Sequence, residues 1–365
     1  MVSIKEKVSQ LFISKNPDNI NGIKKFIKEG IGGFTIGKGG EIINKEQLNL
    51  EGNTEKTLTN FIRKLKDINS KIPLFFAIDG EGGNYFNRLK NISDYKSPRY
   101  YGKKFEKDND LEFFKKEVNK FAELMGRMGL NMNFAPLFDK AEKGYKGYIA
   151  EERAVIKTDL TESEIAGSNR SYSDKRETMN KLAIEAMKIF QKHKIIPTVK
   201  HFPSYGVLNV DQNPHIKLTK INMKKERLLE EIETFKKAVH EGCYAIMTGH
   251  IIISCLDKEK PATISEKVYD FIRKELGFNG LIVSDELNMN AIKDYYSGLK
   301  PEKKPEKAAL DALITNDILL ISHPETFIVM RNAILKKVET NTEIRKKIEE
   351  SYKKIIKYKK IIGLL

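Results

Sequence analysis

Eight short apolar runs alternate with stretches of helical periodicity along this chain, and this alternation restricts the possible fold more than any other feature. Most of the runs end in a polar residue or a glycine, and apolar residues at helical spacing follow. Strands that alternate with helices predict a parallel α/β fold. The predicted strands cover residues 10–13, 30–37, 73–79, 131–136, 195–199, 244–250, 281–286 and 317–322.

The number of these units favours a closed barrel over an open sheet. A chain of 365 residues accommodates eight strand–helix units and long loops in one TIM (β/α)8 barrel. An open dinucleotide-binding sheet would need a Gly-x-Gly-x-x-Gly turn after its first strand, and the glycine-rich segment 30–40 lacks that spacing. No internal repeat or low-complexity linker divides the sequence. We therefore predict a single α/β barrel domain over residues 1–365, which need not be regular.

Apolar faces and end signals predict the helices between the strands. Residues 111–128 and 228–239 each carry apolar residues on one helical face, and glycines follow where a C-cap is expected. Asp174 with Glu177 predicts a helix start of the capping-box type. Lysines alternate with isoleucines over residues 353–362, so we expect an amphipathic terminal helix with a solvated basic face.

Composition narrows the range of partners. The formal charge of +15 could attract nucleic acid, but the lysines are spread along the chain among glutamates and no binding module is recognisable. We expect no nucleic-acid partner, and no membrane partner because no apolar run approaches ~20 residues. The N-terminal segment lacks an apolar signal region, and Cys243 and Cys255 fit a reducing compartment, so we expect a cytoplasmic protein. The oligomeric state is not indicated.

Charged and imidazole side chains follow most of the predicted strands, and in a parallel barrel these strand ends meet at one rim. Hydroxyl groups donate to carboxylates and accept from cations, so such a rim suits a polyhydroxylated ligand. A zinc site formed by His201, His215 and His250 with Asp285 is conceivable, but it lacks the close ligand spacing of known zinc motifs, so we predict no metal and no cofactor. Residues 140–168 form a polar stretch that we expect to be a rim loop or lid. The rim set is Asp79, Asp139, Lys200, His201, His250 and Asp285.

Four of these strand ends resemble motifs of glycoside hydrolase family 3, in particular its single-domain bacterial β-N-acetylglucosaminidases. Residues 78–83 are similar to the Asp-Gln-Glu-Gly-Gly segment, and residues 133–139 to the Phe-Ala-Pro-x-x-Asp strand. Residues 200–206 resemble the Lys-His-Phe-Pro-Gly-His-Gly signature, and residues 284–289 resemble Ser-Asp-Asp-Leu-x-Met. The matches occur in the correct order and span nearly the whole chain. The resemblance implies a TIM barrel that releases terminal N-acetylglucosamine from cell-wall fragments in the cytoplasm.

The resemblance also implies residue roles in a retaining mechanism. Asp285 would be the nucleophile and would form a glycosyl-enzyme intermediate. Adjacent strand residues point to opposite faces, so only one of Asp285 and Glu286 can enter the barrel mouth, and Glu286 would be supporting. Arg88 stands one position later than the corresponding arginine of the family. The residues implied to hold a small carbohydrate substrate are Asp79, Arg88, Arg170, Lys200 and His201.

An Asp-x-His pair on the loop after the fifth strand is the acid–base that the resemblance implies. Asp211 stands at the expected place, and His215 arrives two positions late, after Pro214, which could bend the loop. Tyr205 replaces the second histidine of the signature. We expect this loop to be mobile when the site is empty and to close over the sugar.

Three alternatives remain open at this stage. The shifted histidine would also suit a catalytically weakened sugar-binding protein, and the rim would suit a β-glycosidase for a different sugar. The third alternative is a basic nucleic-acid binder, and only the net positive charge supports it. The sequence indicates neither the aglycone nor whether water or phosphate accepts the sugar.

Overall fold

The structure is a computed structural model, and it describes residues 2–15, 20–36, 54–68, 70–83, 86–87, 89, 92–144, 170–209 and 211–365. Arg88 and most of the predicted rim loop 140–168 lie outside the described residues.

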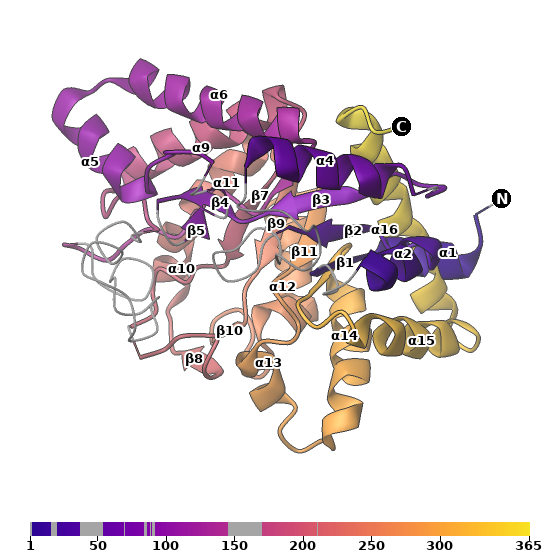
Figure 1. The fold of residues 1–365 in the computed structure, drawn as a ribbon. Helices are drawn as coiled ribbons and strands as arrows, with labels where there is room; N and C mark the ends of the chain where they lie inside the picture. The colour runs from indigo at the N-terminus through magenta and orange to yellow at the C-terminus, as the bar shows by residue number, and fades with distance from the viewer. Residues whose placement is uncertain are drawn as a thin grey trace.

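Eight parallel strands form one sheet in the described part of the chain, in the order β11-β9-β7-β6-β3-β2-β1-β12. An isolated parallel bridge between Val283 and Ile318 links the two outer strands, and the N–H of Leu287 donates to Leu320 O at 2.9 Å. These contacts close the sheet into a barrel. Figure 1 shows strands of this sheet gathered at the centre of the molecule. The strands are β1 (Phe12–Lys15), β2 (Gly33–Thr35), β3 (Phe75–Ile78), β6 (Met132–Asn133), β7 (Ile196–Phe202), β9 (Ala245–Thr248), β11 (Leu281–Ser284) and β12 (Leu319–Ile321).

The TIM-barrel prediction is confirmed, since each predicted strand coincides with one strand of the sheet. The first strand begins later than predicted because Gln10 belongs to the preceding helix. Its side-chain amide donates to the carbonyl oxygens of Gly30 (2.9 Å) and Ile31 (3.2 Å) and so ties this helix to the start of β2.

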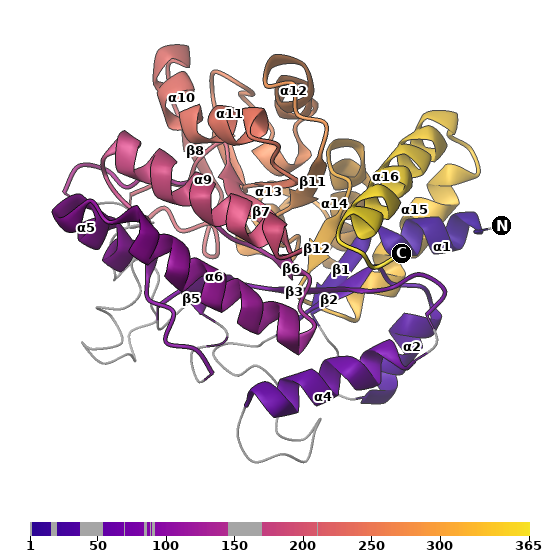
Figure 2. The ribbon, with the colours of Figure 1, turned by 90° about the horizontal axis from the view of Figure 1, so that it is seen from above.

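Helices surround the strands, as Figure 2 shows. The predicted helix over residues 111–128 has these bounds in the structure, and Gly129 ends it with a left-handed backbone (φ 85°). The helices are α1 (Ile4–Gln10), α2 (Ile20–Lys28), α4 (Glu55–Lys66), α5 (Pro98–Asp108), α6 (Leu111–Met128), α9 (Arg176–Lys192), α10 (Lys225–Glu231), α11 (Glu233–His240), α12 (Glu266–Asp270), α13 (Asn290–Tyr295), α14 (Lys304–Thr315), α15 (Thr326–Val338) and α16 (Thr342–Ile361).

Two helix predictions are corrected. Lys175 is the N-cap of α9 and makes no side-chain cap bond, so the capping box at Asp174 was wrong. Asp174 Oδ2 instead accepts a hydrogen bond from the N–H of Gly144 at 2.6 Å, a donor from 30 residues earlier in the chain. The helix predicted over residues 228–239 is divided into α10 and α11 at Ile232.

The terminal helix α16 has a partly buried basic face, unlike the solvated one predicted. Lys359 is fully buried, and its ammonium donates to Gln10 Oε1 (2.7 Å) and Pro73 O (2.6 Å). Burial lowers the pKa of Lys359 to about 7. Lys347 and Lys354 reach the buried carboxylate of Asp317 at 3.2 and 3.4 Å. These lysines fasten α16 to the barrel, at the end opposite the polar rim.

Two small two-stranded sheets complete the described fold. Strands β4 (Gly80–Gly82) and β5 (Phe86–Asn87) are antiparallel and follow β3, while β8 (Thr219–Ile221) and β10 (Ile251–Ile253) are parallel and follow β7 and β9. They belong to the connections at the carboxyl ends of the barrel strands, where the predicted site lies. None of the helices described here is long and apolar enough to cross a membrane.

Candidate active site

Asp285 lies directly after β11 at the rim of the barrel and is 9% exposed. Its Oδ1 accepts the N–H of Glu286 at 2.8 Å, and its Oδ2 accepts the hydroxyl of Tyr205 at 3.0 Å. Burial opposes ionisation of this carboxyl, but the imidazoles of His250 and His201 and the N–H of Glu286 outweigh it and lower the pKa of Asp285 to about 2. Asp285 is therefore a buried carboxylate that is charged over the whole physiological pH range.

Glu286 turns away from this carboxylate. Its Oε1 accepts the N–H groups of Asn288 (2.6 Å) and Ser322 (3.0 Å) and so joins the turn after β11 to the end of β12. Burial raises the pKa of Glu286. Only one of the two adjacent carboxylates thus faces the site, as strand alternation predicts, and the supporting role of Glu286 stays an implication of the resemblance.

A buried salt-bridge network links the ends of β3 and β7. Glu81 has a fully buried side chain, and Arg170 binds it through two parallel hydrogen bonds of 2.8 Å each. The ammonium of Lys200 donates to Glu81 Oε1 (2.8 Å) and to Asp79 Oδ1 (2.9 Å). Burial alone would raise the pKa of Glu81, but Arg170 and Lys200 lower it to about 2. Two N–H donors of Lys200 are thus committed to carboxylates.

Asp139 holds the signature segment after β7 in place. Its fully buried carboxylate accepts the main-chain N–H (3.1 Å) and Nδ1–H (2.7 Å) of His201 and the N–H of Tyr205 (2.6 Å). A carboxylate only accepts, so the His201 proton facing Asp139 is on Nδ1. Three donors from one short segment to one carboxylate fix the orientation of the His201 ring.

His250 follows β9 and is fully buried beside this segment. Its Nε2 lies 2.8 Å from the carbonyl oxygen of Glu286, so Nε2 carries a proton, and the hydroxyl of Thr263 lies 2.8 Å from Nδ1. Burial lowers the pKa of His250, although the charge of Asp285 opposes this. The ring therefore braces the turn after Asp285 through both of its nitrogens.

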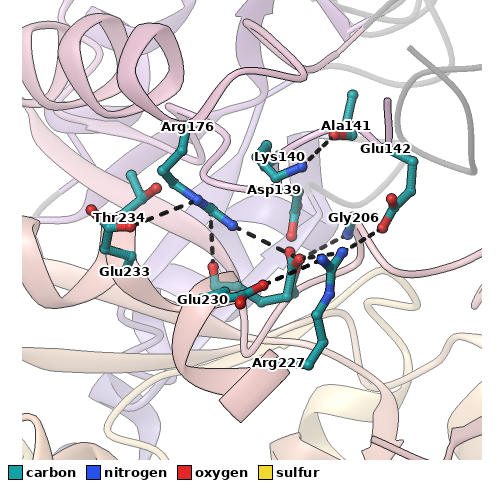
Figure 3. A network of polar contacts seen from close by, with 12 residues as sticks. Asp139, Lys140, Ala141, Glu142, Arg176, Gly206, Arg227, Glu230, Glu233 and Thr234 are labelled. Atoms are coloured by element: carbon teal, nitrogen blue, oxygen red, sulfur yellow. Dashed lines mark hydrogen bonds and ion pairs between the residues drawn. The ribbon is translucent and has the colours of Figure 1, made fainter. Parts of the chain in front are cut away.

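A second network lies beside Asp139 and Gly206 (Figure 3). The buried carboxylate of Glu231 forms ion pairs with the guanidinium groups of Arg227, at an N–O distance of 2.7 Å, and Arg176, at 3.8 Å. It also accepts a hydrogen bond from the hydroxyl of Ser204 at 3.5 Å.

Any side chain at Gly206 would overlap the carbonyl oxygen of Lys140. Glycine is therefore required in this turn, and the turn fixes where the neighbouring Tyr205 side chain points.

The loop that carries His215 is attached to α13, the helix that follows Asp285. The N–H of Ala291 donates to Pro214 O at 3.1 Å, and the N–H of Leu218 donates to Asp294 Oδ2 at 3.1 Å. His215 is exposed as a whole residue, and desolvation of its ring by the surrounding protein lowers the pKa of the imidazole. The charge of Asp285 acts against this shift.

The structure does not pair Asp211 with His215. Its side chain is 78% exposed and lies 3.7 Å from the ammonium of Lys217. Within the described residues no hydrogen bond or ion pair joins Asp211 to His215, whose main-chain N–H is bound by Asn213 Oδ1 at 2.8 Å. The orienting role of Asp211 and the mobility of this loop stay predictions.

The structure thus brings together most of the predicted site residues: Asp79, Arg170, Lys200, His201, His215 and Asp285. Sequence reasoning missed Glu81, Asp139 as an orienting group, and the contact of Tyr205 with Asp285. Glu81 was visible as the glutamate of the Asp-Gln-Glu-Gly-Gly resemblance, which would have been the signal to use. No group of three or more metal-ligating side chains is arranged to hold an ion in the described parts of the chain.

A parallel eight-stranded barrel with carboxylates, cations and imidazoles at the carboxyl ends of its strands defines an α/β-barrel protein built for a polar ligand. Residues 3–358 match the model of the glycosyl hydrolase family 3 N-terminal domain. The chain belongs to glycosyl hydrolase family 3.

Curated relatives and solved structures agree with this membership. The chain is 27% identical over 322 residues to β-hexosaminidase A of Pseudoalteromonas piscicida, covering 83% of this chain and 50% of that protein. It is 26% identical over 243 residues to a β-hexosaminidase of Methylobacillus flagellatus, covering 64% of this chain and 61% of that protein. This chain therefore matches only about half to three fifths of the length of these relatives.

Two solved structures show the same fold. A family 3 β-N-acetylglucosaminidase from a Paenibacillus species superposes with a TM-score of 0.80 at 24% identity, over 100% of this chain and 63% of that one. A β-N-acetylhexosaminidase from Beutenbergia cavernae superposes with a TM-score of 0.77 at 19% identity, over 99% of each chain.

We expect Arg170→Ala to weaken both sugar binding and the fold. It would leave Glu81 buried with Lys200 as its remaining strong partner, and breaking a buried pair costs about 3 kcal/mol or more of unfolding free energy. Urea denaturation measures this loss. The double variant Arg170→Met/Glu81→Gln should recover much of it because no buried charge is left uncompensated.

Lys104→Ala is the matched control, because it breaks the exposed pair with Asp108 and should change stability little. A stability loss for Arg170→Ala no larger than that of Lys104→Ala would contradict the structural role assigned to Glu81.

Proposed function

We propose that this protein is a retaining exo-β-N-acetylglucosaminidase that acts in the cytoplasm on cell-wall fragments or other small glycoconjugates. The observation that carries the proposal is the ionised, buried Asp285 at the rim, together with the cations bound to carboxylates there and the loop of His215, which is attached to the helix that follows Asp285. The names of the relatives, β-hexosaminidase and β-N-acetylglucosaminidase, support the sugar specificity.

The mechanism has two steps. In the first, a carboxylate oxygen of Asp285 attacks the anomeric carbon, the bond to the aglycone breaks, and His215 protonates the departing oxygen. In the second, His215 takes a proton from water as the water attacks the same carbon, and Asp285 leaves as a carboxylate. Asp79, Arg170, Lys200 and His201 hold the sugar hydroxyls during both steps.

An assay of folded protein with an aryl β-N-acetylglucosaminide between pH 4 and 8 tests the proposal. We expect turnover with release of the β-anomer, detected by proton NMR. No turnover above background would reject the glycosidase, and turnover of an aryl β-glucoside at a higher kcat/KM would reject the sugar specificity. Release of sugar phosphate in phosphate buffer would identify phosphate as the acceptor.

A catalytically weakened sugar-binding protein is the second candidate, and the pairing of Asp211 with Lys217 favours it. Its expected signature is binding of N-acetylglucosamine by calorimetry without hydrolysis.

Between acid and neutral pH, kcat/KM should show one pH-dependent change, a fall as the pH rises. His215 must be protonated to act as the acid, and its pKa lies below the ordinary value of about 6.5, so kcat/KM should fall as pH rises through that lowered pKa. Asp285 has a pKa of about 2 and stays charged, so its titration should not change kcat/KM above about pH 3. The measurement uses a substrate with a poor leaving group, whose departure needs the proton, and a rate profile on it that stays flat up to pH 8 would contradict His215 as the acid.

A further inference from the structure

We infer that Tyr205 is a positioning residue for the nucleophile, acting through its phenol hydroxyl on the carboxylate of Asp285. The inference rests on the retaining mechanism proposed above. The hydroxyl of Tyr205 donates to Oδ2 of Asp285 at 3.0 Å, while Oδ1 receives the N–H of Glu286 at 2.8 Å. One donor on each oxygen fixes the plane of the carboxylate and leaves each oxygen a free lone pair.

The hydroxyl of Tyr205 is itself fixed by the main chain. The N–H of His250 donates to Tyr205 Oη at 2.6 Å. Asp285 is ionised and can only accept, so the single hydrogen of the phenol points to the carboxylate. The protein backbone after β9 is therefore connected to the nucleophile through one hydroxyl group.

The ring of Tyr205 has no room to rotate away. It is 1% exposed and stacks on the His201 ring with centroids 4.3 Å apart. On another side it touches Gly249, where an added Cβ would lie 2.7 Å from the ring. The His201 ring is in turn held by Asp139. The hydroxyl thus keeps its place without contact from a ligand.

A donor held on this carboxylate affects the two chemical steps differently. In the first step Asp285 forms a bond to the anomeric carbon and loses negative charge, so the hydrogen bond weakens slightly and opposes attack. In the second step that C–O bond breaks, its electron pair returns to Asp285, and the hydrogen bond stabilises the departing carboxylate. Tyr205 should therefore speed the second step and slow the first step slightly.

This hydroxyl is a feature of the present chain, because the family signature that residues 200–206 resemble has histidine in place of Tyr205.

The test is Tyr205→Phe, assayed with an aryl β-N-acetylglucosaminide that has a good leaving group. A hydrogen bond to a charged group is worth about 1.5–3 kcal/mol, so loss of the phenol should lower kcat by about tenfold or more. KM should fall in parallel because the glycosyl-enzyme accumulates, and kcat/KM should change by less than about threefold. Rapid mixing should show a burst of phenol, and mass spectrometry should find the sugar on the peptide that contains Asp285.

Tyr296→Phe is the matched control. It removes a phenol hydroxyl that likewise donates to a carboxylate, Asp311 Oδ2 at 2.8 Å, and that takes no part in the site. Its kinetics should equal those of the parent protein. Equal losses in kcat and kcat/KM for Tyr205→Phe, or unchanged kinetics, would overturn the inference while leaving the proposed function standing.

Two further outcomes are decisive. A parent protein without turnover would reject the proposed function, and this inference with it. If Tyr205→Phe does not fold, site-specific 3-fluorotyrosine at position 205 keeps the shape and strengthens the donor. It should then raise the rate of the second step, and an unchanged kcat would overturn the inference.

Discussion

Replacement of Asp285 by asparagine is expected to leave the fold intact and to lower kcat by roughly four orders of magnitude or more. The amide has the shape of the carboxylate. Its oxygen can still accept the hydrogen bond from the N–H of Glu286, which lies 2.8 Å from Oδ1 of Asp285 in the parent protein. An amide oxygen is a far poorer nucleophile than a carboxylate oxygen, so no glycosyl-enzyme should form. Steady-state rates, circular dichroism and calorimetric binding of N-acetylglucosamine measure turnover, fold and ligand affinity separately.

Glu286→Gln is the matched control for this substitution. Glutamine keeps an oxygen for the N–H groups of Asn288 and Ser322 that Glu286 now accepts. It should retain most of the activity. Near-native activity in Asp285→Asn together with a large loss in Glu286→Gln would transfer the nucleophilic role to Glu286.

Replacement of His215 by alanine is expected to reduce kcat/KM by an amount that depends on the leaving group. A poor leaving group needs a proton in the first step, and loss of a general acid costs about 100- to 10,000-fold. An activated phenol departs with little proton assistance, so its kcat/KM should fall by less than about tenfold. The measurement compares an alkyl or sugar aglycone with a nitrophenol for the same variant.

Equal losses on both substrates, or no loss, would mean that another group delivers the proton. Asp211→Asn separates two arrangements of the loop. With Asp211 paired to Lys217, as in this structure, the variant should change kcat/KM little. A loss as large and as dependent on the leaving group as that of His215→Ala would show that the loop rearranges to pair Asp211 with His215 during turnover.

Local patterns in the sequence predicted much of the fold and part of the site. A short apolar run followed by a polar residue specifies a buried strand and its end, and eight such runs led to the barrel. Because parallel strands share one carboxyl edge, the sequence also indicated that Asp79, Lys200, His201 and Asp285 would meet there. The motif resemblance then assigned roles to them.

What each side chain contacts was decided by the tertiary structure. Glu81 binds Arg170, 89 residues away, and Tyr205 binds Asp285, 80 residues away. Asp174 was predicted from the sequence to cap a helix, but its carboxylate accepts a hydrogen bond from the N–H of Gly144 instead. The loop of His215 is positioned by Ala291 and Asp294.

By itself, then, the sequence determined which elements form and which polar residues follow them, because periodicity and turn residues act over neighbouring positions. Only the folded barrel decided which carboxylate is held by cations, which faces a phenol and which faces solvent. A buried charge is stable only where donors from several strand ends converge on it, and that convergence exists only once the barrel has closed.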